Sequence, residues 1–195
     1  YQSHKNQELE LKIDHLTKQV NDITTSPKYN QEEAKLSAKF IINKYPFDKQ
    51  TMPDTAIVLG SAQGPFAEDM IKKHPDDFLE INYNDIPGMT KTTVSGHKGR
   101  FLIFKNKILI VDGRKHYYET LNSAKSAFYV KIIKELGIKN LILTNASGSL
   151  DKDHCPKGTV GLITDFDGNI PHPQIGYPNF VSMTHILSDE LNINK

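Results

Sequence analysis

Residues 55–64 read Thr-Ala-Ile-Val-Leu-Gly-Ser-Ala-Gln-Gly, an apolar run that passes directly into small and polar residues. A continuous apolar run of this length is typical of a buried strand, and the glycines after it indicate a tight loop before a helix at about 65–73. A glycine-rich turn after a strand is common, and the lysine of a Walker phosphate loop is missing here. The stretch therefore predicts a strand, a loop and a helix, but it does not identify a ligand or a reaction.

Further strands are indicated by four stretches of apolar residues, at 101–104, 107–111, 140–144 and 159–164. Residues 123–136 have helical periodicity and stop at Gly137, a residue at which helices commonly end. Strands and helices at this spacing predict an α/β fold with a mixed or largely parallel central sheet flanked by helices.

The amino-terminal segment has an apolar residue every three or four positions, at Leu9, Ile13, Leu16, Val20 and Ile23. This spacing is the seam of a coiled coil over about two heptads. We expect residues 1–26 to form an amphipathic, coiled-coil-like helix and residues 29–195 to form the α/β domain. A second helical pattern begins around Pro27 and Tyr29 and closes before Pro46. Two interpretations stay open, because the seam can dock against a partner or fold onto its own domain.

Composition excludes several classes of function. The 195 residues carry 24 basic and 23 acidic side chains, so the net charge of +1 gives no general attraction to nucleic acid or a membrane surface. No apolar run approaches the roughly 20 residues that span a bilayer. A single cysteine, Cys155, excludes an intrachain disulfide framework and fits the cytoplasm or another reducing intracellular compartment. The histidines lack metal-ligand spacing, so we expect no metal and no cofactor.

Three strand-end loops, at 60–64, 112–119 and 145–149, contain residue types that hold an anion. Ligands collect at the carboxyl ends of strands in such sheets. Arg114 and His116 project to the same side if the chain is extended there, so both could face one oxyanion. Each loop alone also fits an ordinary turn.

A fourth segment, residues 92–100, is polar and small and carries His97 and Arg100. It fits either a mobile loop that brings charge over a bound anion or an ordinary hairpin connection. Arg100 and Arg114 are the only two arginines of the chain, which otherwise uses lysine for positive charge.

Five segments, in chain order, carry a family resemblance: Ile-Val-Leu-Gly-Ser at 57–61, Tyr-Asn-Asp-Ile-Pro-Gly at 83–88, Thr-Val-Ser-Gly-His-Lys-Gly-Arg at 93–100, Gly-Arg-Lys-His-Tyr-Tyr-Glu at 113–119, and Leu-Gly-Ile-Lys-Asn-Leu-Ile-Leu-Thr-Asn-Ala-Ser-Gly at 136–148. Together they resemble the trimeric purine nucleoside phosphorylase and methylthioadenosine phosphorylase family. The match covers about residues 29–191 and weakens after Leu150.

The resemblance implies a mixed central sheet flanked by helices, usually assembled as a homotrimer. It also implies a reaction of purine salvage, in which inorganic phosphate, as co-substrate, attacks the anomeric carbon of a purine nucleoside and releases the free base and ribose 1-phosphate. Such a transferase needs no protein nucleophile, because phosphate itself attacks and the protein positions charges.

The phosphate ligands implied by the resemblance come from all three strand-end loops. Ser61 would bind phosphate through its hydroxyl and backbone, and Ala146 through its backbone N–H. Arg114 and His116 would supply charge-assisted hydrogen bonds.

The remaining roles implied by the resemblance concern the reacting sugar. His97 would lie on a mobile loop near the phosphate and, with His116 and Glu119, would belong to the catalytic group. Tyr118 would contact the ribose. Arg100 looks structural rather than catalytic in this comparison.

Several positions depart from the family pattern. Gln63 replaces a leucine, and Ser149 stands where glycine's freedom at positive φ could be needed. Residues 165–168 replace the family's Asp-His-Ile-Asn, and Tyr177 is merely near the position of an aromatic that the family lends across the subunit interface. The family's purine-binding Glu and Asn come from a region beyond the last residue of this sequence, so the α/β domain is expected to be incomplete at its carboxyl end.

Two hypotheses follow for the function. The chain is a purine nucleoside phosphorylase if a carboxyl portion with the purine site exists. Alternatively, it is a non-catalytic, phosphorylase-derived subunit, a pseudoenzyme, held in a homotrimer or a larger assembly through residues 1–26.

Overall fold

The computed structural model describes residues 9–17, 27–45, 52–89, 98–105 and 107–163. Within these ranges the chain forms, in order, α2 (Pro27–Lys44), β1 (Thr55–Val58), α3 (Gly64–Lys73), β2 (Phe78–Asn82), β3 (Arg100–Phe104), β4 (Ile108–Asp112), α4 (Tyr117–Thr120), α5 (Ser123–Ser126), α6 (Phe128–Glu135) and β5 (Asn140–Leu143). Single 3-10 turns at Pro75–Asp77 and Tyr83–Asp85 flank β2. These elements confirm the predicted α/β class.

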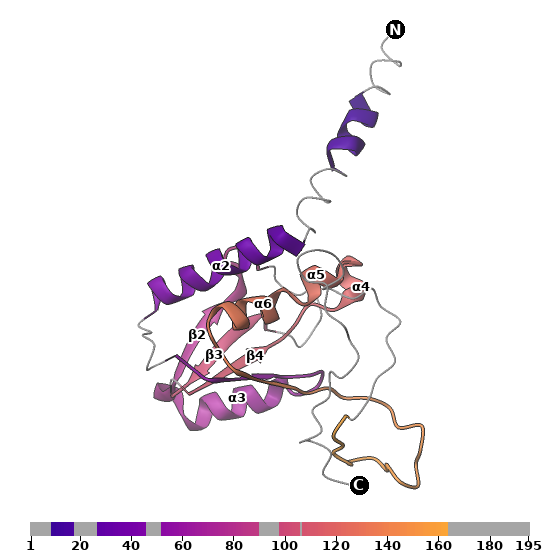
Figure 1. Ribbon diagram of the computed structural model, residues 1–195. Helices are drawn as coiled ribbons and strands as arrows, with labels where there is room; N and C mark the ends of the chain where they lie inside the picture. Colours follow the sequence, from indigo (N-terminus) through magenta and orange to yellow (C-terminus); the bar gives the residue numbers. More distant parts are fainter. Residues whose placement is uncertain (1–8, 18–26, 46–51, 90–97, 106, 164–195) are drawn as a thin grey trace.

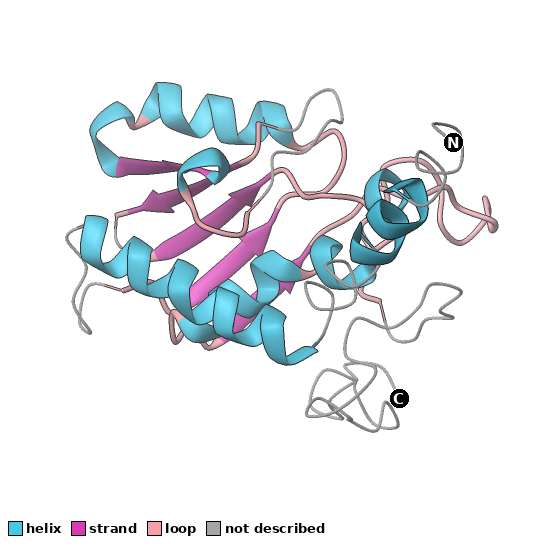
Figure 2. Cartoon of the chain, turned by 90° about the horizontal axis from the view of Figure 1, so that it is seen from above, coloured by secondary structure: helices cyan, strands magenta, loops and turns pink. Residues whose placement is uncertain are grey.

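The described strands form one mixed sheet in the order β2-β3-β4-β1-β5 (Figure 1). The strands β4, β1 and β5 are parallel neighbours, whereas β2, β3 and β4 pair antiparallel. Figure 2 shows these strands side by side with helices flanking them. The predicted mixed sheet is therefore present, and its parallel half contains the strands that precede the three candidate loops.

The inner strands β3 and β4 bury apolar side chains on both faces because successive residues point to opposite sides of a sheet. Phe101 and Ile103 of β3 belong to the core cluster under α2 and α6, whereas Leu102 between them belongs to the cluster with Ala67 of α3. Figure 1 shows the same division, with α2 and α6 on one face of the sheet and α3 on the other. The result is a three-layer arrangement.

Helix α2 covers the sheet because its apolar residues return at helical spacing. Ala34, Ala38 and Ile41 are buried and lie on one face of the helix. Between them the hydroxyl of the buried Ser37 lies 2.8 Å from the backbone oxygen of Glu33 and 2.6 Å from that of Pro87, and it donates its single proton to this pair of acceptors. These bonds satisfy a polar group inside an otherwise apolar contact.

Two local differences separate the structure from the sequence prediction. The single helix expected over 123–136 is divided into α5 and α6 at Ala127, whose backbone leaves helical geometry at φ −96° and ψ 4°. Strand β2 was not predicted, because its Phe-Leu-Glu-Ile-Asn sequence lacks a clean apolar pattern. Glu80 in this strand forms an ion pair with Arg100 of the neighbouring strand β3.

The strand predicted over 159–164 is wrong for its described part, residues 159–163, which form no strand. The apolar side chains that suggested it are exposed, with Val160 at 97%, Leu162 at 61% and Ile163 at 57%. A strand needs a neighbour for its backbone groups. Residues 159–163 have no such neighbour within the part of the chain that is described.

Residues 9–17 are helical, as the seam predicted. Leu9, Ile13 and Leu16 are 53–58% exposed, so this part of the seam is not folded onto the α/β domain. Val20 and Ile23 lie outside the described residues. Across the described ranges, we find no helix with the length and apolar character required to cross a membrane.

Candidate functional site

The carboxyl ends of three neighbouring strands lie at one edge of the sheet. Val58, the last residue of β1, is opposite Val111 of β4 on one side and Leu143 of β5 on the other. Because these strands are parallel, the loops that follow them leave the sheet at the same level. These three loops carry the phosphate ligands expected from the sequence: Ser61 after β1, Arg114 and His116 after β4, and Ala146 after β5.

The loop after β1 is a tight turn that presents Ser61 to solvent. The amide of Gln63 donates to the backbone oxygen of Gly60 over 3.2 Å. Ala62, at the third position of this turn, has φ +67°, which is the type II geometry that normally selects glycine. An L-residue in this conformation is strained, and such strain collects at functional loops. Ser61 is exposed at the turn's second position.

The loops after β1 and β5 are in direct contact. The amide of Gly60 donates to Gln63 Oε1 over 2.8 Å and to Thr144 Oγ1 over 3.1 Å. The Thr144 hydroxyl also forms a hydrogen bond with Gln63 Oε1 and lies 2.7 Å from the backbone oxygen of Val58. Gln63, a departure from the family pattern, thus connects the two loops through its side chain. The sequence marked this position as unusual but gave no role for it.

The loop after β4 is shaped by Gly113 and by a buried tyrosine. Gly113 has φ +98°, a conformation that favours glycine. The hydroxyl of Tyr83 donates to the backbone oxygen of Gly113 over 2.8 Å. Burial raises the pKa of Tyr83 well above its ordinary value, so this hydroxyl keeps its proton and stays a donor. Sequence reasoning missed Tyr83, although it lies at the start of one of the family-like segments.

His116 and Glu119 are linked at the start of α4. The amide of His116 donates to Glu119 Oε1 over 2.6 Å, which is the capping geometry of a helix start. The His116 ring stacks on Tyr118, with ring centroids 5.0 Å apart and an interplanar angle of 10°. Tyr118 itself is 66% exposed. These contacts bring three of the expected site residues together in one short turn.

Arg114 is half-buried beside α6. Burial raises the pKa of Tyr129 in that helix, and the positive charge of Arg114 partly opposes this shift. The guanidinium therefore lies within electrostatic range of the Tyr129 hydroxyl.

The loop after β5 is the most exposed of the three. Residues 145–150 are all exposed, and β5 is an edge strand within the described part of the sheet. Ser149 does not adopt a positive φ, so this position does not require glycine. Its hydroxyl donates to the backbone oxygen of Asp151 over 2.7 Å instead.

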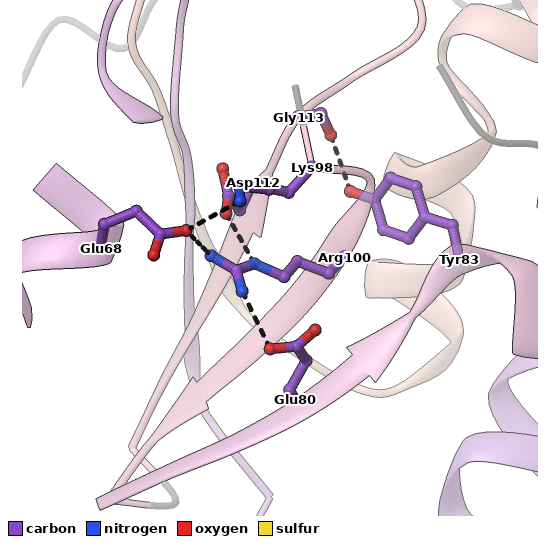
Figure 3. A network of polar contacts seen from close by, with 7 residues as sticks. All are labelled: Glu68, Glu80, Tyr83, Lys98, Arg100, Asp112 and Gly113. Atoms are coloured by element: carbon purple, nitrogen blue, oxygen red, sulfur yellow. Dashed lines mark hydrogen bonds and ion pairs between the residues drawn. The ribbon is translucent and has the colours of Figure 1, made fainter. Parts of the chain in front are cut away.

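His97, expected near the phosphate, lies outside the described residues. Arg100, which the sequence placed in the same polar segment, is not on a loop: it opens β3 and is buried among three carboxylates (Figure 3). Its guanidinium contacts Asp112, Glu80 and Glu68 at 2.6–2.9 Å. The structural interpretation of Arg100 is therefore supported.

A hollow of about 350 Å³ lies on the α3 side of the sheet, lined by Gly64, Pro65, Glu68, Asp69, Lys72 and Lys98. The hollow touches the end of the first strand-end loop at Gly64, but none of Ser61, Arg114, His116 and Ala146 lines it. Within the described ranges, no three His, Cys, Asp or Glu side chains gather as metal ligands would.

Similarity to known proteins supports a common origin for this fold and its loops. A family model described as the phosphorylase superfamily matches residues 54–192. Purine nucleoside phosphorylase 1 of Geobacillus stearothermophilus is 32% identical over 154 residues, which are 77% of this chain and 52% of that protein. The purine nucleoside phosphorylase of Mus musculus is 29% identical over 140 residues, 70% of this chain and 45% of the relative.

A solved structure gives the same comparison. The purine nucleoside phosphorylase of Schistosoma mansoni in complex with acetate matches with a TM-score of 0.51 and 29% identity, over 62% of this chain and 42% of that one. The chain thus spans about half the length of the relatives it matches.

Proposed function

The chain belongs to the phosphorylase superfamily, and we propose that it binds inorganic phosphate between the loops that follow β1, β4 and β5. One observation carries this proposal: three adjacent parallel strands end at one edge, each directly before a loop with an expected phosphate ligand. Ser61 supplies a hydroxyl and Ala146 a backbone N–H. Arg114 supplies the positive charge, and His116 a second donor.

The reaction we propose is the phosphorolysis of a purine nucleoside. A phosphate oxygen forms a bond to the anomeric carbon of the ribose while the bond from that carbon to the purine nitrogen breaks. The bonding pair leaves with the base, which takes up a proton, and the products are ribose 1-phosphate and free purine. The named relatives are purine nucleoside phosphorylases, which supports this choice of substrate class.

The residues of this chain would bind and orient the phosphate in that reaction. Arg114 and His116 would orient phosphate and offset its charge, and an exposed Tyr118 beside His116 would contact the sugar. Glu119 would hold the His116 backbone in place through the 2.6 Å bond between them. His97 remains a proposed catalytic residue. We propose no metal or cofactor.

The purine half of the reaction is not assigned to any residue of this chain. The chain spans about half of its relatives' length, so full turnover is a proposal about the complete catalytic unit. The test is an intact mass of the native polypeptide followed by an inosine phosphorolysis assay with and without phosphate. Free base formed only with phosphate supports the enzyme, whereas phosphate binding without turnover by a polypeptide of about 22.0 kDa favours a pseudoenzyme.

A second candidate function is a structural role in an assembly, as a homotrimer or a subunit of a larger complex. It is favoured by residues 9–17, whose helical seam exposes Leu9, Ile13 and Leu16. Exposed apolar residues at this spacing fit a coiled coil. The two functions are compatible, because the seam is separate in sequence from the three strand-end loops.

A further inference from the structure

Arg100 lies between the end of β4, where the Arg114 loop starts, and α3, where the Ser61 loop ends (Figure 3). It is the first residue of β3 and is only 8% exposed. Each of its three side-chain nitrogens contacts a carboxylate, on Asp112, Glu80 and Glu68. A guanidinium whose nitrogens are all engaged in this way is a connector between elements rather than a ligand for phosphate.

On one side Arg100 fixes the end of β4. Its Nε donates to Asp112 Oδ2 over 2.8 Å, and Asp112 is only 1% exposed. The backbone oxygen of the same Asp112 accepts from the amide of Gly99 over 3.0 Å. Asp112 comes two residues before Arg114, so these contacts set the point from which the Arg114 loop leaves the sheet.

On the other side Arg100 fixes α3. Its Nη2 donates to Glu68 Oε1 over 2.6 Å, and Lys98 Nζ lies 3.6 Å from the same oxygen. Glu68 is one turn beyond Gly64, where the loop that carries Ser61 becomes helix. The bond therefore ties the first turns of α3 to the sheet.

The third carboxylate provides an internal comparison. Arg100 Nη1 donates to Glu80 Oε2 over 2.9 Å, and Glu80 lies on β2, which carries no residue of the candidate phosphate site. Glu68 and Glu80 thus contact the same guanidinium through similar bonds and have partly exposed side chains, at 38% and 50%. The two carboxylates differ in the element that each connects to Arg100, because Glu68 lies on α3 and Glu80 lies on β2.

We propose that Arg100 is a positioning residue for the candidate phosphate site, acting through Glu68 on the Ser61 loop and through Asp112 on the Arg114 loop. The inference rests on the phosphate-binding role proposed above. In this role Arg100 does more than stabilise the fold through a buried ion pair, because Arg100 couples the geometry of two loops that belong to one site.

The test compares Glu68→Gln with Glu80→Gln. Each removes one carboxylate charge from Arg100 and keeps the side-chain size. We expect Glu68→Gln to raise the hydrogen-exchange rate of the amides in residues 59–66 by about threefold or more and to weaken phosphate binding by a similar factor. In Glu80→Gln both quantities should stay within about twofold of the unmodified chain, even if the two variants lose similar thermal stability.

Equal acceleration of exchange at residues 59–66 in both variants, or none in Glu68→Gln, would overturn the inference. Phosphate is the probe for binding. If the unmodified chain does not bind it, the proposed function fails, and the exchange rates still decide whether Glu68 orders the Ser61 loop. The two failures are therefore distinguishable.

Discussion

The amide of Gly60 lies 3.1 Å from the side-chain oxygen of Thr144 and donates a hydrogen bond to it. This contact joins the loops after β1 and β5, which are 84 residues apart in the sequence. The backbones approach so closely that a Cβ on residue 60 would lie 2.6 Å from the backbone oxygen of Thr144. Glycine is therefore required at position 60 because the Thr144 backbone leaves no room for a Cβ, and not because the position has a positive φ.

Gly60→Ala should destabilise the fold by about 1–3 kcal/mol, because the two backbones must separate to admit a methyl group. Urea unfolding of the purified variant measures this change in the free energy of unfolding. Gly161→Ala is the matched control, since a Cβ at that position meets nothing within 4 Å, and it should change stability by less than about 0.5 kcal/mol. Equal stability of Gly60→Ala and the unmodified chain would show that the two loops are not packed as described.

Changing Ile13 to Lys should lower the oligomeric state of the chain. Ile13 lies on the seam with Leu9 and Leu16, and a charge there cannot be buried between helices. Analytical ultracentrifugation measures the change, and Val20→Lys tests the next position of the seam.

Leu11→Lys is the control for this experiment, because Leu11 is 70% exposed and lies off the seam. It introduces the same charge on the same helix and should leave the sedimentation coefficient unaltered. Identical sedimentation of the Ile13 and Leu11 variants would remove the case for assembly through this helix.

The stability of the chain should depend on pH through Glu68. Burial raises the pKa of this carboxyl, but attraction to Arg100 and the hydrogen bond from it, with a smaller contribution from Lys98, outweigh burial, so the pKa is lowered. A carboxyl with a lowered pKa in the folded state stabilises the fold above its ordinary pKa of about 4.3, and that contribution is lost as the pH falls through the lower, folded value.

The unmodified chain should therefore exceed Glu68→Gln in stability at pH 6–7, and the difference should vanish at acid pH. Denaturant unfolding of both proteins at several pH values measures this difference. If the difference in the free energy of unfolding is constant from neutral pH to below pH 4, the charge of the Glu68 carboxylate does not contribute to stability.

Much of the central fold could be predicted from local sequence. The continuous apolar runs after Asp54 and Lys107 predicted two strands, and these form the parallel pair β1 and β4. The strand expected at 159–163 failed because apolar composition alone does not supply a pairing partner. Strand β2, in contrast, is a strand without an apolar pattern. Its Glu80 forms an ion pair with Arg100 on the neighbouring strand, a contact that no local sequence pattern reveals.

The candidate site shows the same division. Ser61, Arg114 and His116 could be proposed as ligands because such folds bind ligands at strand ends, and the topology brings the ends of their strands to one edge of the sheet. The role of Gln63 could not be predicted, because it depends on Thr144, which is distant in the sequence. Tyr83 was missed for a related reason, since its bond to the Gly113 backbone oxygen depends on how two strands lie together.

The most direct measurement is a calorimetric titration of the chain with inorganic phosphate, compared between Arg114→Ala and Lys107→Ala. Both variants lose one positive charge, but Lys107 lies at the other end of β4 from Arg114. We predict one phosphate site that Arg114→Ala weakens at least about tenfold and Lys107→Ala leaves intact, since a hydrogen bond to a charged group contributes about 1.5–3 kcal/mol. Phosphate affinity that is undetectable in the unmodified chain, or equal in the two variants, would contradict a phosphate site at the ends of β1, β4 and β5.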